Sequence, residues 1–542
     1  MAAMSYKVVY LFLSFHVIFV YGKSSLCPDI EKCECSQSNK KLNQVDCQDI
    51  NNMAELKNLA FDLQYMRIPV LKIHQCNAKS IPRNSFFNFS IKSFSSACPF
   101  SNIDDDSLKQ IDSLRELKLL STEFTEIPTA VGRLVDLRVL YTNDGKLTHV
   151  KMEFQNMTRL RELSLKNNKI SLIAEKAFYG NSNLKTIDLS ENNLMSLSPA
   201  TFEESRKLKK VLLQVNKLNS TKGIFKNSNI QEINIRDNRL ESINDAFKIE
   251  LELEILDLGK NPLKQIGPKA FNSNVRQLKT LILDQCELFS LPSMVFQYLT
   301  KLEKLDLSHN KLETISPEIF EALRNLREIN LSDNEIRILG DLFSKNSRLE
   351  RIDLSRNLIQ SCDSIFYGLQ NLKSIDLSYN QLEVPHELPP EVGELYLQNN
   401  LLTSLINLNI HSLTYLRYLD VERNNLKNVD FYLPENLETF KFASNNLTRF
   451  LTYFSANIST WTLSNNPWIC DCDAIQFLNF LKNESNKVVD INTTRCGEIG
   501  KNTELYGKLI IELTEYELCP ERLRSHIFLS VSPANIGIHR FS

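Results

Sequence analysis

The chain has 542 residues, of which 42% are apolar and 24% charged, a composition typical of a folded protein rather than a disordered one. Its formal net charge of −2 gives no support for binding nucleic acid or an anionic membrane surface. The 14 glycines are too few for a low-complexity protein or a glycine-rich phosphate-binding protein.

The N-terminus carries a targeting signal. Lys7 precedes a short apolar stretch from Val8 to Val20, and the small residue Gly22 follows it. A basic start, a short apolar stretch and a small residue predict a secretory signal peptide over residues 1–22. An N-terminal membrane anchor is the alternative, but the stretch falls short of the ~20 residues that a spanning helix needs.

A repeated pattern organises most of the chain. Leu-x-x-Leu-x-Leu-x-x-Asn begins at Leu160, and the same pattern with Ile in the fourth position begins at Leu184. The fourth and sixth positions alternate with polar neighbours, which predicts a short strand with its apolar side chains on one side. Strands of successive units then pair in parallel. We count about eighteen units, starting at residues 68, 91, 114, 137, 160, 184, 208, 230, 253, 278, 302, 326, 349, 372, 392, 416, 437 and 458.

Asparagine recurs at the ninth position of the units. Its side chain is expected to turn inward and to bond backbone amides and carbonyls of neighbouring turns, which the bend would otherwise leave unpaired. The residues are Asn168, Asn192, Asn216, Asn238, Asn261, Asn310, Asn334, Asn357, Asn380, Asn400, Asn424, Asn445 and Asn466.

Phenylalanine recurs 17 or 18 residues after the unit starts. An aromatic stripe can line a ligand groove, but ten rings in register predict a buried spine on the convex side. The residues are Phe154, Phe178, Phe202, Phe225, Phe247, Phe271, Phe296, Phe320, Phe343 and Phe366.

Eight of the twelve cysteines cluster near the two ends of the chain, four at 27, 33, 35 and 47 and four at 470, 472, 496 and 519. Behind a signal peptide they predict disulfides, since Cys-x-Cys is not the spacing of zinc ligands. Cys76 and Cys98 hold near-equivalent places in the first two units, so we expect a bridge between them. Cys286 and Cys362 are too far apart to pair, and Cys286 is expected to be buried and inert.

The repeats and their cysteine-rich ends resemble the extracellular leucine-rich repeat family. The segment 466–472, Asn-Pro-Trp-Ile-Cys-Asp-Cys, is similar to the C-terminal flank of Toll-like receptor ectodomains and related secreted proteins. The resemblance implies an α/β fold: a right-handed solenoid, or horseshoe, with a parallel concave sheet, a convex side of loops and short helices, and disulfide-stapled caps. It also implies pairing of Cys27 with Cys35, Cys33 with Cys47, Cys470 with Cys496 and Cys472 with Cys519, whereas spacing alone allows three connectivities for each set of four.

The expected organisation has five parts. A signal peptide covers 1–22, a cysteine-rich N-terminal flank 27–50, the repeats 51–466, a cysteine-rich C-terminal flank 467–520 and a disordered tail 521–542. In the C-terminal flank, Ile475, Leu478 and Leu481 have helical spacing and are expected to face the last repeat.

Eight Asn-x-Ser/Thr sequons fit a glycoprotein of the secretory pathway. Asn330 falls at the fifth position of its unit, on the concave side, where a glycan would obstruct the middle of that face. The sequons are Asn88, Asn156, Asn219, Asn330, Asn446, Asn457, Asn483 and Asn492.

No catalytic signature is present, and we expect no catalytic, cofactor-binding or metal-binding residues. Aspartates recur at the fifth position, where a row of carboxylates could form a cation site or an acidic docking face. We favour the alternative that Leu-Asp-Leu-Ser is a common form of the repeat, with its aspartate solvated. The residues are Asp188, Asp257, Asp306, Asp353, Asp376 and Asp420.

The concave face is the expected binding surface, and binding hot spots favour tyrosine and arginine. Projecting the repeats onto it brings together a hypothetical patch over adjacent turns. It consists of Tyr379, Tyr396, Tyr418, Glu422 and Arg423.

The sequence therefore predicts a secreted glycoprotein that binds an extracellular protein and serves as an immune-type recognition protein. Its partner is an extracellular protein ligand or co-receptor. One alternative is the ectodomain of a Toll-like receptor whose membrane and signalling parts are missing, which would place a membrane-anchored form at the cell surface. The other is a non-catalytic scaffold or carrier subunit of an extracellular complex. Residues 527–533 are too short and proline-broken for a membrane helix.

Overall fold

The computed structural model describes residues 32–38, 41–52, 55, 58, 67–86, 90–109, 111, 113–244, 246–362, 365–384, 388–428, 433–450, 458–498 and 503–520. The predicted signal peptide, Cys27 and the tail from residue 521 lie outside them. The chain divides into two compact units, Met1–Pro262 (unit 1) and Leu263–Ser542 (unit 2), which are described in turn.

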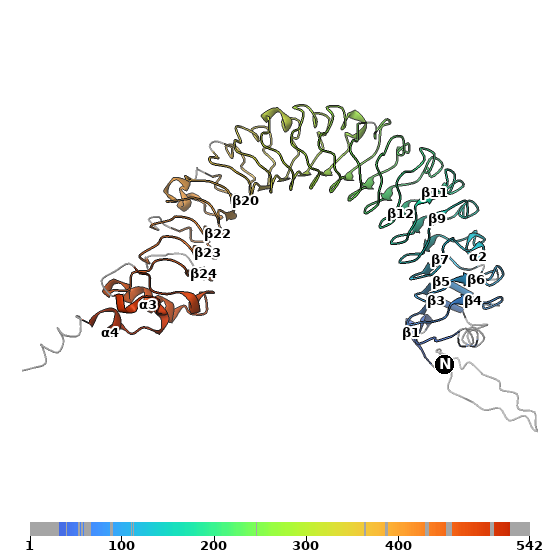
Figure 1. The fold of residues 1–542 in the computed structure, drawn as a ribbon, viewed down its shortest axis with the longest axis horizontal. Coiled ribbons are helices and arrows are strands. Elements are labelled where there is room, and N and C mark those ends of the chain that lie inside the picture. Colours follow the sequence, from blue (N-terminus) through green and yellow to red (C-terminus); the bar gives the residue numbers. More distant parts are fainter. Residues whose placement is uncertain are drawn as a thin grey trace, which may run out of the picture. The chain divides into compact units, whose positions relative to one another are not determined.

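Unit 1 begins with an antiparallel hairpin of β1 (Cys33–Ser38) and β2 (Lys41–Cys47). β2 pairs in parallel with β3, and each later strand of the inner sheet adds in parallel to the one before it (Figure 1). The strands are β3 (Arg67–Ile73), β5 (Ser90–Ser96), β7 (Glu116–Leu119), β8 (Val139–Tyr141), β10 (Glu162–Ser164), β12 (Thr186–Asp188), β13 (Lys210–Leu212), β14 (Glu232–Asn234) and β15 (Ile255–Asp257).

Outside that sheet, the described residues of unit 1 include short parallel strand pairs and a helical turn. The pairs are β4 (Ser80–Ile81) with β6 (Asn102–Ile103), and β9 (His149–Val150) with β11 (Leu172–Ile173). The helical turn is α2 (Thr129–Gly132).

Unit 2 continues the same architecture with parallel neighbours from β16 to β24. The strands are β16 (Thr280–Ile282), β17 (Lys304–Asp306), β18 (Glu328–Asn330), β19 (Arg351–Asp353), β20 (Ser374–Asp376), β21 (Glu394–Tyr396), β22 (Tyr418–Asp420), β23 (Thr439–Lys441) and β24 (Thr460–Thr462).

Short 3₁₀ turns and two helices make up the other regular structure of unit 2. The 3₁₀ turns of the repeats are η1 (Ser273–Val275), η2 (Pro317–Ile319), η3 (Ile406–Leu408) and η4 (Ile410–Ser412). The C-terminal segment holds η5 (Cys472–Ala474), α3 (Ile475–Asn483), η6 (Ile491–Thr493), η7 (Thr503–Leu505), η8 (Ile510–Glu512) and α4 (Glu515–Leu518).

A strand lies at each of the eighteen expected unit starts, and the expected solenoid with a parallel inner sheet is confirmed. The reason is the alternation within each unit. In and after β17, for example, Leu305 and Leu307 are buried, whereas the alternating residues Lys304 and Asp306 reach the surface.

The ninth-position asparagines hold neighbouring turns together, as predicted. The side chain of Asn334 donates to the carbonyls of Leu307 and Leu331, each at 3.0 Å, and its Oδ1 accepts from the amide of Leu312 at 3.0 Å. Leu307 and Leu312 belong to the preceding turn, so one buried side chain satisfies backbone groups of two turns.

The phenylalanine spine is also confirmed. All ten rings are buried. Successive rings pack against one another, with centroids 6.0 Å apart between Phe154 and Phe178 and 5.8 Å apart between Phe320 and Phe343. The rings are therefore committed to the core rather than to a ligand groove.

Disulfides occur at both ends of the chain. The structure joins Cys33 to Cys47, Cys76 to Cys98, Cys470 to Cys496 and Cys472 to Cys519, which are expected pairs. Cys35 is also disulfide-bonded, and its expected partner Cys27 lies outside the described residues. Cys286 and Cys362 are buried thiols.

Helix α3 closes the last turns of unit 2 with an apolar face. Ile475, Leu478 and Leu481 are buried as expected, and Phe477 is buried with them. Phe477 stacks on Phe450 with ring centroids 4.5 Å apart. The aromatic rings therefore join the helix to the preceding repeats.

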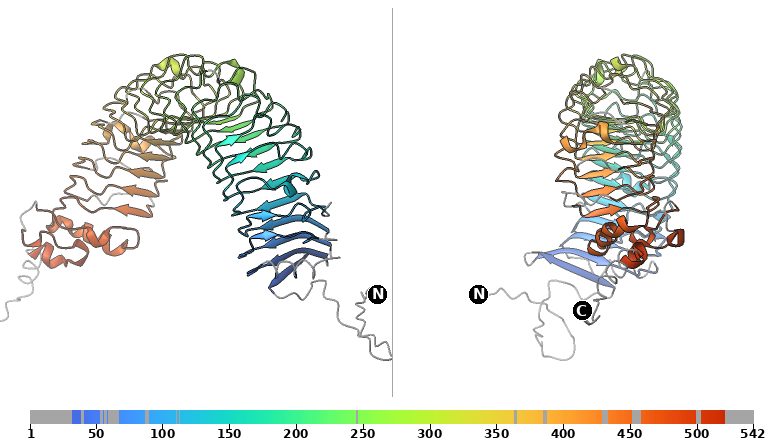
Figure 2. Two further views of the ribbon diagram at one scale, coloured as in Figure 1. Left: turned by 45° about the vertical axis from the view of Figure 1, so that its right-hand side comes forward. Right: turned by 90° about the vertical axis from the view of Figure 1, so that its left-hand side faces the viewer.

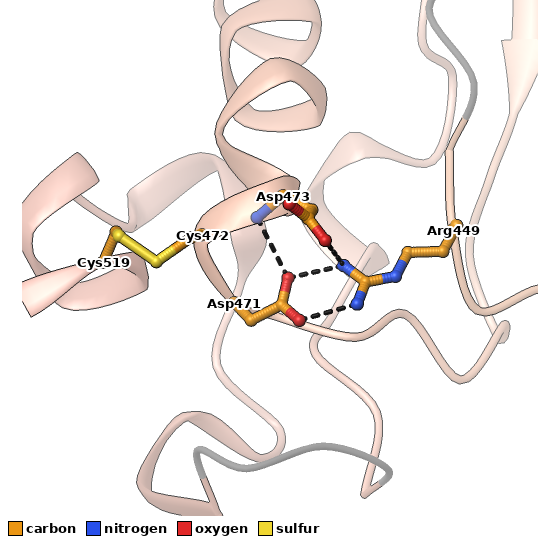
Figure 3. Close-up of a disulfide and its surroundings, with 5 residues drawn as sticks. All are labelled: Arg449, Asp471, Cys472, Asp473 and Cys519. Carbon is orange, nitrogen blue, oxygen red and sulfur yellow. Dashed lines mark hydrogen bonds and ion pairs between the residues drawn. A yellow bond between two sulfur atoms is a disulfide. The ribbon is translucent and has the colours of Figure 1, made fainter. Parts of the chain in front are cut away.

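An ion pair fixes the start of this C-terminal segment (Figure 3). Arg449 donates to both carboxylate oxygens of Asp471, at 2.5 and 2.6 Å, and lies 3.5 Å from Asp473. Asp471 directly precedes Cys472, whose disulfide reaches Cys519. The hydrogen bond from Arg449 holds the pKa of Asp471 below its usual range.

Removing one ninth-position asparagine is expected to destabilise unit 2. Asn334→Ala leaves four backbone groups without this partner, which costs about 2–4 kcal/mol in unfolding free energy. Thermal unfolding of the full chain should show a clear fall in Tm. The matched control is the neighbouring exposed Glu335→Ala, and equal Tm values for the two variants would contradict the role of Asn334.

The Arg449–Asp471 pair predicts a pH-dependent contribution to stability. Because the folded-state pKa of Asp471 is lowered, the pair stabilises the fold above the unfolded pKa of about 4 and loses its effect as pH falls through the folded pKa. Arg449→Gln should therefore lower Tm at pH 7, and the difference from the unmodified chain should shrink below about pH 4. The exposed Arg324→Gln is the control. A difference that is independent of pH would refute this assignment.

Candidate binding surface

Part of the predicted patch is brought together on the exposed side of β21 and β22. The rings of Tyr396 and Tyr418 lie with centroids 4.8 Å apart. The register explains the contact, since Tyr396 is opposite Asp420 and Tyr418 is opposite Glu394. The two rings thus meet diagonally across adjacent strands, a distance that aromatic side chains reach.

Two charged residues that the projection missed complete this cluster. Lys441 lies over the Tyr418 ring, 5.3 Å from its centroid, and 3.7 Å from Asp420. The Tyr418 hydroxyl donates to Asp420 at 3.3 Å. Lys441 is opposite Asp420 in the register of β22 and β23, so comparing fifth positions of adjacent units would have found it. We call Tyr396, Tyr418, Asp420 and Lys441 the tyrosine cluster.

The tyrosine cluster is partly shielded from water. Burial raises the pKa of Asp420 above its ordinary value and also raises the pKa values of Tyr396 and Tyr418. The hydrogen bond with the Tyr418 hydroxyl is the main cause that raises the pKa of Lys441. The raised pKa values keep both phenols neutral at pH 7, and Lys441 and Asp420 lie beside them.

The other predicted residues lie around the cluster with different partners. The ring of Tyr379 packs under the guanidinium of Arg356, at 4.2 Å from its centroid. Glu422 accepts a hydrogen bond from Thr462. Arg423 is exposed. The structure therefore unites Tyr396 and Tyr418 but ties Tyr379 and Glu422 to other neighbours.

A groove of about 760 Å³ borders the tyrosine cluster where the strands β19 to β23 begin. Tyr418 lines both the groove and the cluster. Charged residues of both signs line it, among them Arg351, Glu391, Glu394 and Arg417. The surface beside Tyr418 is thus a groove with charged residues in its lining rather than a flat apolar patch.

The fifth-position aspartates have a structural role. Asp306 accepts hydrogen bonds from the amide and hydroxyl of Ser308, at 3.0 and 2.7 Å. Asn330 makes the same two bonds with Ser332. The carboxylates thus stabilise the turn after each strand instead of being simply solvated, and Asp257 and Asp420 are buried. The other fifth-position aspartates also accept a hydrogen bond from the backbone amide two residues later. They are Asp188, Asp257, Asp353, Asp376 and Asp420.

Most of the predicted sequons lie at the surface. Asn330 is half-buried on the exposed side of β18, and Asn88 and Asn457 lie outside the described residues. Asn156, Asn219, Asn446, Asn483 and Asn492 are exposed.

Within the described ranges, no group of three or more His, Cys, Asp or Glu side chains is arranged to hold a metal ion. Across the same residues, no helix combines the length and apolar character that crossing a bilayer requires.

The sequence matches a repeat family. A family model described as leucine rich repeat matches residues 158–218, 276–336 and 337–382, and a second model of that description matches 371–395. The matched residues lie in both units and end at Leu395, directly before Tyr396 of the tyrosine cluster.

Known proteins resemble the chain over part of its length. Podocan-like protein 1 of Homo sapiens is 29% identical over 234 residues, which is 41% of this chain and 44% of that protein. CD180 antigen of Mus musculus is 26% identical over 276 residues, which is 44% of this chain and 41% of that protein. The chain thus spans less than half of either relative.

Among solved structures, the crystal structure of a TLR13–ssRNA13 complex has a similar fold. Its TM-score is 0.60 with 20% sequence identity, over 88% of this chain and 81% of that chain. This likeness concerns the fold alone.

Neutralising a shielded aspartate near the cluster is expected to stabilise the chain. Burial raises the pKa of Asp376, so its ionised form is disfavoured in the folded state, and stability rises as pH falls through the folded pKa. Asp376→Asn keeps an acceptor for Ser378, as Asn330 does for Ser332, and should raise Tm at pH 7 by about 1–3 °C. The gain should vanish at low pH, and a lower Tm at pH 7 would contradict this explanation.

Proposed function

Since the chain is a leucine-rich repeat protein with disulfide-bonded flanks, we propose that it is a secreted glycoprotein that binds an extracellular protein. Its role is that of an immune-type recognition protein. Binding is located at the tyrosine cluster and the groove beside it. The disulfides and the exposed sequons support the secretory part of the proposal.

The observation that carries the binding proposal is the contact between Tyr396 and Tyr418. Two tyrosine rings with centroids 4.8 Å apart, held by a rigid sheet, offer a large contact area at a small cost in side-chain entropy. Lys441 and Asp420 supply charged groups at the rim of the rings. This combination suits a protein surface that presents an apolar side chain surrounded by polar groups.

The frame of the repeats restricts where else a partner can bind. The apolar residues at the fourth and sixth positions, the ninth-position asparagines and the ten spine phenylalanines are buried. A partner therefore contacts the variable exposed positions, which differ from turn to turn. A glycan on Asn330 would cover the strand β18, four strands before the tyrosine cluster at β22, and would favour binding towards the C-terminal end of unit 2.

The test is affinity capture from the native extracellular fluid with the immobilised full chain, followed by affinity measurements with each captured protein. The double variant Tyr396→Ala/Tyr418→Ala should weaken binding of the true partner by about 30-fold or more, as loss of a hot spot does. Both strands keep their buried residues, so circular dichroism should report an unchanged fold.

The matched control is Tyr298→Ala/Tyr367→Ala, which removes two exposed tyrosines elsewhere in unit 2. Its affinity should stay within about twofold of the unmodified chain. Equal affinities for the two double variants would refute the tyrosine cluster as the binding surface.

A further inference from the structure

A row of six basic residues runs along one edge of the inner sheet in unit 1. They hold the second position of six successive repeats, next to or within the strands β5 to β13. Each residue after the first donates its backbone amide to the carbonyl of the one before it, at 2.7–2.8 Å. We call the row the basic ladder: Lys92, Arg115, Arg138, Arg161, Lys185 and Lys209.

The hydrogen bonds of the backbone fix the pitch of the basic ladder. Adjacent parallel strands lie about 4.8 Å apart, so the six residues extend over about 24 Å. Figure 2 shows the strands of unit 1 stacked side by side. Five of the side chains are exposed, and that of Arg115 is half-buried. The ladder is thus a regular array of cations on one surface.

Few acidic groups offset this charge. Arg115 lies 3.8 Å from Asp136, which also pairs with Arg159. In the part of the chain that the structure describes, the other five ladder residues make no ion pair. Of the carboxylates beside the ladder, Glu116 accepts from Ser93 and Glu162 accepts from Tyr141.

The same register position in unit 2 has a different charge pattern. There the charge alternates in sign over the five second positions from Lys279 to Lys373, and Glu350 pairs with both Arg327 and Lys373, at 2.5 and 2.6 Å. Like charges on adjacent strands repel, and alternation removes that repulsion. Unit 1 retains the repulsion over six turns, which a bound polyanion would relieve.

We propose that the basic ladder binds a linear sulfated polysaccharide of the extracellular matrix or cell surface. A sulfated chain of sugars carries anionic groups along its length and can lie along the edge of the sheet. Each ladder residue then contacts a sulfate or carboxylate, and the counterions of both chains are released.

The neighbours of the ladder favour a polysaccharide over a nucleic acid. Single-stranded nucleic acids bind where aromatic side chains stack on their bases beside a basic groove. The ring of Tyr141, at the fifth position of its repeat, lies under Lys118, 5.0 Å from the ring centroid, and its hydroxyl donates to Glu162. The third positions that follow the ladder residues contain no aromatic side chain. They are Ser93, Glu116, Val139, Glu162, Thr186 and Lys210.

Binding is measured with the full chain and a fluorescent heparin-derived hexasaccharide at several salt concentrations. Two further probes of comparable length are a hyaluronan oligosaccharide, which has carboxylates but no sulfates, and an oligouridylate. The sulfated probe should bind most tightly, and its affinity should fall steeply as salt rises.

The variant Arg138→Gln/Arg161→Gln/Lys185→Gln removes three adjacent exposed cations from the ladder. The control Lys169→Gln/Lys176→Gln/Lys226→Gln changes the net charge equally with three exposed lysines of unit 1 outside the ladder. The ladder variant should bind the sulfated probe roughly 10- to 100-fold more weakly at physiological salt, with a slope of log Kd against log salt that is smaller by about 2. The control variant should bind like the unmodified chain.

Two results would overturn the proposal. Equal weakening in the ladder and control variants would show that general charge attraction, rather than the array, holds the probe. Binding of the oligouridylate as tightly as the sulfated probe, with the same dependence on the ladder, would assign the surface to nucleic acid.

Discussion

The structure depends on the hydrogen bonds that each ninth-position asparagine makes with the turn before it. The bend after every strand leaves backbone groups that water cannot reach. Asn216 satisfies them for one turn by donating to the carbonyl of Leu189 at 3.0 Å and accepting from the amide of Leu194 at 3.0 Å. Since each turn is completed by its neighbour, a single repeat cannot bury its own polar groups, and stability accumulates along the array.

This constraint separates the residues that hold the fold from those that can bind. Leucine, asparagine and phenylalanine recur because each buried place accepts few alternatives. The exposed positions are free to vary, and they vary differently in the two units. Unit 1 gathers like charges in the basic ladder, whereas unit 2 gathers aromatic rings in the tyrosine cluster, so the two surfaces suit partners of different chemistry.

Much of the fold was predictable because the repeat imposes one environment eighteen times. The strand positions, the buried ninth-position asparagines and the phenylalanine spine followed from spacing alone. The ion pair of Arg449 with Asp471 was not predictable, because these residues come from different turns with no repeated pattern between them. Phe477 was missed for a similar reason, since its contact with Phe450 depends on how helix α3 packs.

The candidate site was only partly predictable. Projecting residue types onto the face found Tyr396 and Tyr418 but grouped Tyr379 with them, although its ring packs under Arg356. Lys441 was overlooked because lysine on a surface is common, and only its register with Asp420 marks it. The basic ladder can also be found in the sequence, because it appears when the second positions of successive repeats are compared with one another.

Native-state amide hydrogen exchange tests the central role of the asparagines most directly. The amides of Leu194, Leu240 and Leu312 donate to asparagine side chains of the following turn and lie outside the strands. They should be as protected as the strand amides and should exchange only through cooperative opening of several turns. Exchange at the rate of an unstructured peptide would show that the asparagines do not hold the turns together, and would contradict the account.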